Sequence, residues 1–290
     1  MLETFDIDAL PLHQALLVFL ADPLILACIA IDLLMVISLI KNPPDWKSRT
    51  ARLNFRSWSV SEAEAIILAS VMFILAVKAL IPAFYDVGAI DQKNLETFLL
   101  LGQTFIFQMP VIILIIVLLT RKGRIKTGIL GYAPADILSS FKKGFIFCLG
   151  AMPVVGMTSL IQNHFLIKAG FTNEPQYVIE LFNTPGPLWL KSYLVFTTII
   201  MAPITEEFIF RGIGTSAFAD KIGIKGTVFL LSIAFGAIHL NLYSFGPLCI
   251  IAMSFSIAYI YSGSLLVPVF MHSIFNTLNL VAIFISNQIT

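Results

Sequence analysis

Charge is what this sequence has least of. Only 12% of its 290 residues are charged and 58% are hydrophobic, whereas soluble domains average about 25% charged and about 45–50% apolar residues. The 18 basic and 17 acidic residues leave a formal net charge of +1. This composition excludes an ordinary water-soluble globule, and the lack of a basic excess argues against a nucleic-acid-binding protein.

Full charges are missing altogether from one long region. No Asp, Glu, Lys or Arg occurs from Gly226 to Thr290, a stretch of 65 residues that contains two of the four histidines, His239 and His272. Cysteine is also scarce, and the three cysteines have no metal-type spacing. We therefore interpret them as buried apolar residues and not as disulfides or metal ligands.

Long apolar runs are abundant. Only helices and closed barrels span lipid, and these continuous runs lack the alternation of barrel strands. The sequence therefore predicts an all-α fold, a polytopic transmembrane helical bundle of about eight spans. Asp22 followed by Pro23 predicts the start of the first span, with the carboxylate as N-cap and proline in the first helical position. The predicted spans are residues 23–40, 64–85, 97–120, 144–168, 188–213, 226–242, 246–262 and 265–286.

We expect a single integrated membrane domain made of two parts. Residues 1–140 would supply N-terminal membrane helices, about three spans with basic cytoplasmic linkers, and residues 141–290 a core of about five spans. Residues 41–56 carry five basic residues and one acid, and residues 121–143 carry six and one. The positive-inside rule places both linkers in the cytoplasm, and the span count then places residues 220–225 on the same side.

Two adjacent carboxylates, Glu206 and Glu207, lie within the fifth predicted span. Burying a charge in a membrane costs about 3 kcal/mol even on insertion-based scales, so such groups pair or face a wet cavity. Glu207 and Arg211 have the i, i+4 spacing, with the acid first, that favours an ion pair on one helix face. Glu206 is rotated by about 100° and is left as a free carboxylate, a candidate general base. An interfacial salt-bridge cluster is the alternative interpretation.

Two further elements follow in the next spans. One is Phe235-Gly-Ala-Ile-His239, and the other is His272-Ser-Ile-Phe-Asn276. The i, i+4 spacing places His272 and Asn276 on one helix face. An imidazole and an amide can donate hydrogen bonds to an anion without carrying full charge.

The spacing of these elements permits a shared site. A turn near Ile222 would lie 16 residues after Glu206 and 17 residues before His239. An antiparallel helical hairpin about this turn would therefore hold both side chains at similar depth, in the inner half of the membrane.

In a polytopic protein, this order of motifs resembles the CPBP family, which comprises the type II CAAX prenyl endopeptidases and the bacterial Abi, or bacteriocin-processing, proteins. The resemblance covers about residues 188–286. It implies a glutamate-type intramembrane endopeptidase that hydrolyses a peptide bond of a membrane-associated substrate, either prenylated or leader-bearing. The motifs are EExxxR (Glu206, Glu207, Arg211), FxxxH (Phe235, His239) and HxxxN (His272, Asn276).

The resemblance also implies a role for each residue. Glu206 would be the base that activates a water molecule, and His239 would help to hold that water. His272 and Asn276 would form the oxyanion hole. The supporting residues would be Glu207, Arg211 and Phe235.

Two alternatives stay open. Glu206, His239 and His272 could bind zinc, because His₂Glu plus water is a known catalytic ligand set; the sequence has no HExxH motif, and we favour a mechanism without a cofactor. The chain could instead be a non-catalytic membrane scaffold or a bacteriocin-immunity-type protein that binds through the same polar pocket. The expected partners are the lipid bilayer and a peptide or protein substrate, lipidated or not, and no nucleic acid. The expected location is a prokaryotic cytoplasmic membrane.

Overall fold

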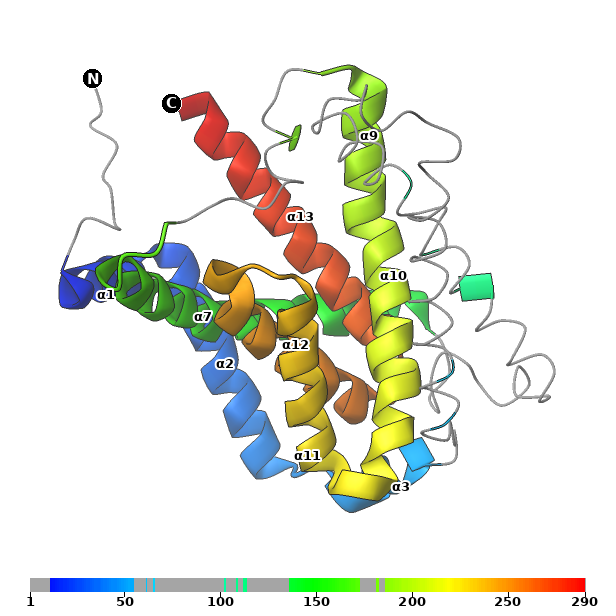
Figure 1. Cartoon of the computed structure of the whole chain (residues 1–290). Helices are drawn as coiled ribbons and strands as arrows, with labels where there is room; N and C mark the ends of the chain where they lie inside the picture. Colours follow the sequence, from blue (N-terminus) through cyan, green and yellow to red (C-terminus); the bar gives the residue numbers. More distant parts are fainter. Residues whose placement is uncertain are drawn as a thin grey trace, which may run out of the picture.

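The computed structural model describes residues 11–54, 136–172 and 186–289, and the isolated positions 61, 65, 102, 108, 112–113 and 181–182. Every element in these residues is a helix, as predicted (Figure 1). The helices are α1 (Leu12–Ala21), α2 (Pro23–Lys41), α3 (Trp46–Asn54), α7 (Ile137–Lys168), α9 (Leu188–Phe196), η5 (Thr197–Met201), α10 (Ala202–Glu207), η6 (Phe208–Gly214), α11 (Thr215–Ile238), α12 (Leu242–Ser262) and α13 (Leu266–Ile289).

Five helical runs in the described part of the chain are long and apolar enough to cross a membrane. They confirm a helical, multi-pass membrane protein. The predicted spans 64–85 and 97–120 lie outside the described residues, so a total of eight stays a prediction. The five runs are Pro23–Lys41, Ile137–Lys168, Leu188–Ile238, Leu242–Ser262 and Leu266–Ile285.

The long run Leu188–Ile238 reverses direction at Gly223, at the lower end of the bundle in Figure 1. Gly223 has φ 71° and ψ 162°, a conformation that glycine adopts readily because it has no Cβ. On the two sides of this residue, Phe210 and Phe235 pack edge to face with ring centroids 5.3 Å apart. The chain therefore forms an antiparallel hairpin whose turn lies where the sequence predicts it, next to Ile222.

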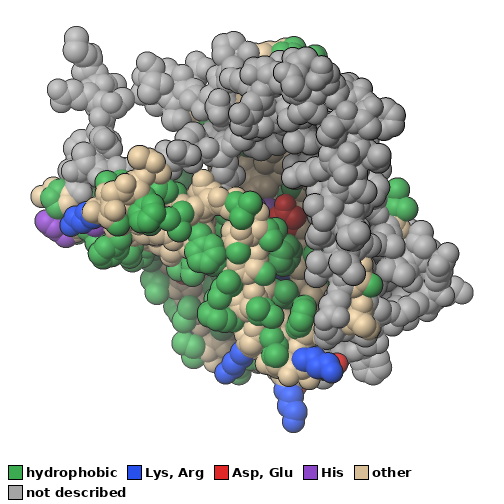
Figure 2. Space-filling model, viewed as in Figure 1, with side chains coloured by type: hydrophobic (Ala, Val, Ile, Leu, Met, Phe, Trp, Pro, Cys, Tyr) green, Lys and Arg blue, Asp and Glu red, His purple; other side chains and the backbone are tan. Residues whose placement is uncertain are grey.

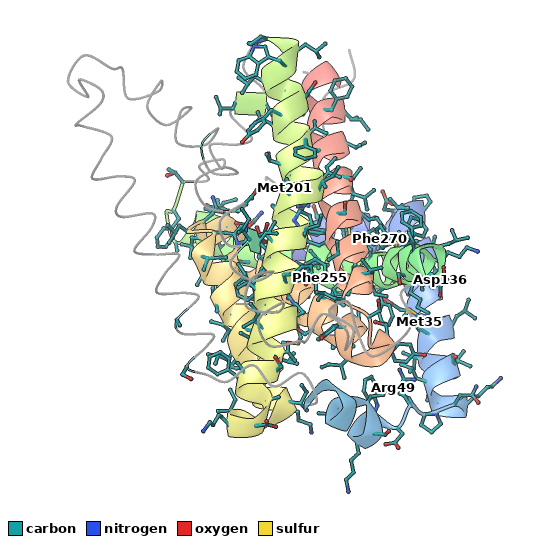
Figure 3. All side chains as sticks on the ribbon, turned by 90° about the vertical axis from the view of Figure 1, so that its right-hand side faces the viewer. Met35, Arg49, Asp136, Met201, Phe255 and Phe270 are labelled. Atoms are coloured by element: carbon teal, nitrogen blue, oxygen red, sulfur yellow. The ribbon has the colours of Figure 1, made fainter. Side chains whose placement is uncertain are left out.

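α12 is the central helix of the described bundle. Half of its span is buried inside the protein, compared with 6% of α2, so α2 is peripheral and faces outward. α7, α11 and α13 all pack on α12, and Phe255 of α12 lies in the middle of the bundle in Figure 3. α7 runs across the bundle: it extends from side to side in Figure 1 and is seen nearly end-on in Figure 3.

The start of the first described span follows the sequence signal. The Asp22 carboxylate accepts hydrogen bonds from the backbone N–H groups of Leu24 (2.8 Å) and Ile25 (3.2 Å). Pro23 occupies the first helical position, where its missing N–H costs nothing. The predicted helix start is therefore present.

Two of the basic segments, 41–56 and 220–225, lie at one end of the bundle. The basic linker 121–143 is described only from residue 136, the N-cap of α7, and Asp136 lies above Arg49 in Figure 3. α3 lies within the basic linker 41–56 and packs on α11 and α12. The Arg49 guanidinium lies over the Tyr261 ring, 4.6 Å from its centroid, and the Trp46 ring also contacts Tyr261. Figure 2 shows basic side chains at this lower end, where the Gly223 turn also lies. The two segments that the charge pattern assigns to one side of the membrane thus lie at the same end.

We expect Gly223→Ala to destabilise the protein by about 1–3 kcal/mol, because the backbone conformation here is unfavourable for residues with a Cβ. A Cβ at Gly223 would meet no atom within 4 Å, so no steric clash contributes. Unfolding curves of the detergent-purified protein measure the effect.

Gly226→Ala is the matched control. A Cβ there would make ordinary contacts of 3.4–3.6 Å with Ile222, and alanine is favoured over glycine within helices by about 0.5–1 kcal/mol. Equal losses of stability in the two variants would contradict the role assigned to the turn.

Candidate active site

A cavity of about 680 Å³ opens between the described helices, and all four residues with a predicted catalytic role line it: Glu206, His239, His272 and Asn276. Phe235 also lies in the wall. Figure 2 shows an acidic side chain at the bottom of a hollow in this face, and Glu206 is the only acidic residue among the described residues that line the cavity. The hairpin, together with α13, therefore brings the three sequence motifs to one place.

Two π-helical segments flank the glutamates. η5 precedes α10 and η6 follows it, and π-turns occur frequently at functional sites. Pro203 lies in the first turn of α10 and has no N–H to donate to the carbonyl four residues earlier, at Ile199. Ala202 donates its N–H to the Thr197 carbonyl, five residues earlier, as in a π-helix. The carbonyls of Thr198 and Ile199 therefore both lack their usual α-helical donors.

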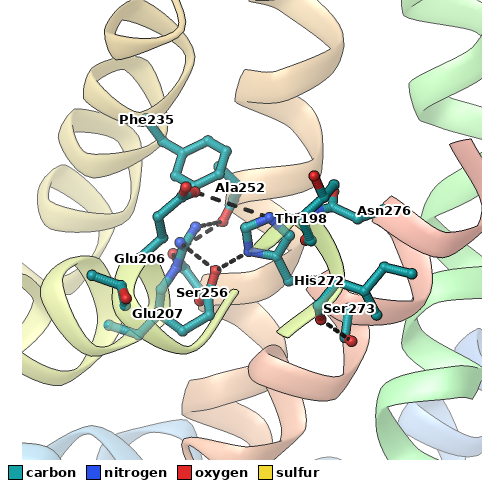
Figure 4. A network of polar contacts seen from close by, with 12 residues as sticks. Thr198, Glu206, Glu207, Phe235, Ala252, Ser256, His272, Ser273 and Asn276 are labelled. Carbon is teal, nitrogen blue, oxygen red and sulfur yellow. Dashed lines mark hydrogen bonds and ion pairs between the residues drawn. The ribbon is translucent and has the colours of Figure 1, made fainter. Parts of the chain in front are cut away.

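α13 supplies the missing donors. The Ser273 hydroxyl donates to the Ile199 carbonyl, and Asn276 Nδ2 donates to the Thr198 carbonyl at 2.8 Å (Figure 4). These two bonds attach α13 to the glutamate-bearing helix and set the position of His272, which precedes Ser273 in the chain.

The predicted ion pair is present and fully buried. Glu207 Oε1 accepts a hydrogen bond from Arg211 Nη1 at 3.0 Å, and both side chains are 0% exposed. Arg211 also donates from Nη2 to the Ala252 carbonyl (2.6 Å) and from Nε to the Ser256 hydroxyl (3.3 Å), both on α12. The positive charge is therefore neutralised by one carboxylate, and the two other nitrogens of the guanidinium, Nε and Nη2, each donate one hydrogen bond to α12.

His272 lies between the two carboxylates (Figure 4). Its Nδ1 is 3.0 Å from Glu207 Oε1, and because an ionised carboxylate only accepts, Nδ1 carries the proton. Its Nε2 faces Glu206 Oε2 at 4.0 Å. Phe255 stacks on the imidazole with ring centroids 4.9 Å apart, and Phe235 meets it edge-on at 5.7 Å. These contacts fix the ring and direct Nε2 towards Glu206.

Glu206 differs from Glu207 in its surroundings. Its side chain is 23% exposed, and its Oε2 has no hydrogen-bond partner among the residues that the structure describes. No arginine neutralises it by contact, since Arg211 bonds to Glu207. A carboxylate oxygen in such a place can accept a proton from a water molecule in the cavity.

His239 directly follows α11, on the opposite side of the hairpin from Glu206. Its Nδ1 lies 2.8 Å from the Phe235 carbonyl, and because the carbonyl accepts, Nδ1 carries the proton and Nε2 is the acceptor. Glu206 lies four residues before Phe210 and His239 four residues after Phe235, and these two rings pack against each other across the hairpin. The two side chains are thus level in the hairpin, as the spacing about Ile222 predicts.

The predicted oxyanion donors are constrained by their other bonds. One hydrogen of the Asn276 amide is donated to the Thr198 carbonyl, which leaves the second hydrogen of the –NH₂ group for a ligand. His272 Nε2 can donate only when the ring is a cation, because Nδ1 already carries the proton of the neutral form. The oxyanion roles stay predictions.

The zinc alternative finds no preformed ligand set. In the described ranges, no group of three or more His, Cys, Asp or Glu side chains is arranged to hold a metal ion. The Nδ1 atoms of His239 and His272 are engaged with Phe235 and Glu207. The choice between metal-free hydrolysis and zinc chemistry is therefore left to experiment.

Four contacts of the site are not predicted by the sequence: the stacking of Phe255, the two acceptors on α12 at Ala252 and Ser256, and the hydroxyl of Ser273. Two features of the sequence indicate that such contacts are needed. A buried arginine has five N–H donors and needs more acceptors than one glutamate offers, and Pro203 removes the α-helical donor of the carbonyl four residues earlier. Neither feature says which helix provides the partner.

The fold and the site together define a class: a multi-pass helical membrane protein with carboxylate and imidazole groups around a cavity inside the bundle. Residues 187–278 match the family described as Type II CAAX prenyl endopeptidase Rce1-like. This segment contains the EExxxR, FxxxH and HxxxN motifs, so the resemblance is confirmed over these residues. Comparisons with curated proteins and with solved structures found no match.

We expect Arg211→Met to lower stability by about 3–5 kcal/mol, because it leaves the Glu207 carboxylate buried without a balancing charge. The double variant Arg211→Met/Glu207→Gln should be less destabilised than the sum of the single variants, since it removes both charges. Unfolding curves of the four proteins give the coupling. Strict additivity would contradict a shared buried ion pair.

Proposed function

We propose that this chain is a CAAX-type intramembrane endopeptidase, which hydrolyses a peptide bond of a membrane-associated substrate by a metal-free mechanism. The observation that carries the proposal is the convergence of Glu206, His239, His272 and Asn276 on one cavity. Glu206 is the only carboxylate in this group, and Arg211 pairs with Glu207 instead of with Glu206. The match of residues 187–278 to an endopeptidase family supports the same reaction class.

The reaction begins when Glu206 takes a proton from a water molecule that His239 helps to orient. The water oxygen forms a bond to the carbonyl carbon of the scissile peptide, and the carbonyl oxygen becomes an oxyanion. The free N–H of Asn276 and the His272 side chain stabilise this oxyanion. The C–N bond then breaks, and the proton held by Glu206 passes to the leaving amine.

Each group contributes a different share of the rate. A well-placed general base contributes about 10²–10⁴-fold, and one oxyanion donor about 10²–10³-fold. The apolar surroundings strengthen both effects, because charges interact more strongly where water is excluded. Glu207 acts on the reaction indirectly, since it holds the proton of His272 on Nδ1.

The walls of the cavity indicate the kind of substrate. Most of the lining is apolar, with contributions from Phe19 and Ile25 of the N-terminal helices and from Met152 of α7. An apolar peptide segment near the scissile bond fits such walls. We further propose that the protein lies in a prokaryotic cytoplasmic membrane with the Arg49 end towards the cytoplasm, because α3 and the basic residues beside the Gly223 turn lie at that end.

Glu206→Gln should lower turnover at least about 100-fold, because an amide cannot take the proton from water. The assay uses quenched fluorescent peptides that end in Cys-aliphatic-aliphatic-X, with and without a farnesyl group on the cysteine. Unfolding curves check that the variant still folds. His239→Ala should lose activity in the same way.

Asp220→Asn is the matched control, because Asp220 is exposed and does not line the cavity, and it should keep wild-type turnover. Wild-type turnover in Glu206→Gln would show that the assigned base is wrong. A wild-type protein that binds these peptides without cleaving them would favour the scaffold alternative.

Chelation tests the metal-free mechanism. Turnover should be unchanged after dialysis against EDTA or 1,10-phenanthroline, because water activation is assigned to side chains alone. Loss of turnover that added zinc restores would overturn this part of the proposal and favour zinc held by Glu206, His239 and His272.

A further inference from the structure

One side chain of α7 inserts into the beginning of α12. Gln162 Nε2 donates to the carbonyls of Leu242 (2.6 Å) and Tyr243 (3.0 Å), and its Oε1 accepts from the Gly246 N–H (2.9 Å). Three hydrogen bonds from one amide thus hold the first turn of a helix that lies about 80 residues further along the chain.

Pro247 explains why this turn needs a partner from outside. Proline has no N–H, so the carbonyl four residues earlier, at Tyr243, has no donor within α12. An unpaired carbonyl in a membrane is strongly destabilising, because no water is there to replace the missing bond. Gln162 supplies the donor that Pro247 cannot.

The first turn of α12 has room for the Gln162 amide only because residue 246 is a glycine. A Cβ at Gly246 would overlap Gln162 Oε1, so a glycine is needed where the amide enters. A second bond reaches the same turn from the segment after α7, since the Tyr243 hydroxyl donates to the Phe171 carbonyl at 2.8 Å. Residues on both sides of the α7 terminus therefore hold the start of α12.

This turn is directly connected to His239. α11 ends at Ile238 and α12 begins at Leu242, so three residues separate the two helices. A displacement of the first turn of α12 must therefore be transmitted to His239 through a very short connection.

The end of α11 also packs closely on the same turn. A Cβ at Gly236 would lie 2.9 Å from the Phe245 carbonyl and 2.7 Å from Cys249 Sγ, so the two backbones are in close contact. Four residues in or next to the turn, namely Asn241, Tyr243, Ser244 and Pro247, line the cavity beside His239.

We propose that Gln162 is a positioning residue of the active site, which sets the place of His239 by clamping the first turn of α12. The inference rests on the proposed function. The inference gives α7 a part in the reaction, although α7 lies outside the matched residues 187–278. Gln162 itself does not line the cavity and acts only through the turn.

Gln162→Leu should lower kcat on the farnesylated peptide by about 10- to 100-fold with little change in KM, since a displacement of about 1 Å of a reacting group costs up to 10²-fold. Ile161→Leu, a conservative change at the exposed neighbouring position on α7, is the matched control and should keep wild-type kcat.

The double variant Gln162→Leu/Pro247→Ala separates positioning from folding. Alanine provides the N–H for the Tyr243 carbonyl, so the double variant should recover thermal stability. It should not recover kcat, because α12 is then continuous at this turn and no longer held by α7. If Gln162→Leu does not fold, the double variant carries the test.

A second measurement does not depend on turnover. Diethyl pyrocarbonate should modify His239 at a changed rate in Gln162→Leu, relative to the exposed His13. Wild-type kcat and an unchanged His239 rate in Gln162→Leu would overturn the inference, as would a double variant that regains kcat together with stability. Absence of turnover in the wild-type protein would instead overturn the proposed function. The rate of His239 modification would still show whether Gln162 sets the position of His239.

Discussion

One buried carboxylate oxygen, Glu207 Oε1, connects three of the helices around the cavity. It pairs with Arg211 and accepts from His272, and Arg211 in turn reaches α12 at Ser256. In the interior of a membrane-embedded bundle an unpaired charge is too costly to persist, so each of these groups needs the others. This requirement fixes the position of α13 and the proton of His272. It also leaves Glu206, one residue earlier, as the carboxylate that is not used for structure.

Two prolines in this part of the chain also create buried polar groups that need partners from other helices. Pro203 and Pro247 each leave a carbonyl without its usual α-helical donor, and in each case a polar side chain from another helix donates a hydrogen bond to that carbonyl. Ser273 of α13 bonds beside Pro203, and Gln162 of α7 bonds beside Pro247. In water such carbonyls would be hydrated and would not hold one helix against another. In a bilayer they become attachment points, which is how the helices that carry Glu206 and His239 are held at defined positions.

The features that sequence analysis predicts here are the local ones. The Glu207–Arg211 pair and the turn next to Ile222 follow from the helical period and from residue counting, which apply before helices pack. The contact between His272 and Glu207 spans 65 residues and depends on how α13 is rotated, which spacing does not encode. Hydropathy also ends one predicted span at residue 213 and begins the next at residue 226, whereas in the structure the helix continues through residues 214–222. Backbone hydrogen bonds persist in charged segments, so a fall in hydropathy does not end a helix.

The order of residues in the EExxxR motif decides which carboxylate remains reactive. Arg211 is four residues after Glu207, so the helical period directs its charge to the second glutamate. An arginine at the position of Phe210 would stand four residues after Glu206 and would neutralise the carboxylate that faces the cavity. The chain instead has an aromatic ring at that position, packed against Phe235 across the hairpin. A rotation of about 100° per residue thus separates a neutralised carboxylate, which holds helices together, from a free one that can accept a proton. Among the described residues, no other acidic residue and no lysine or arginine lines the cavity. The charge of Glu206 is therefore not neutralised by a lysine or arginine in the wall, and its basicity is available to a bound water.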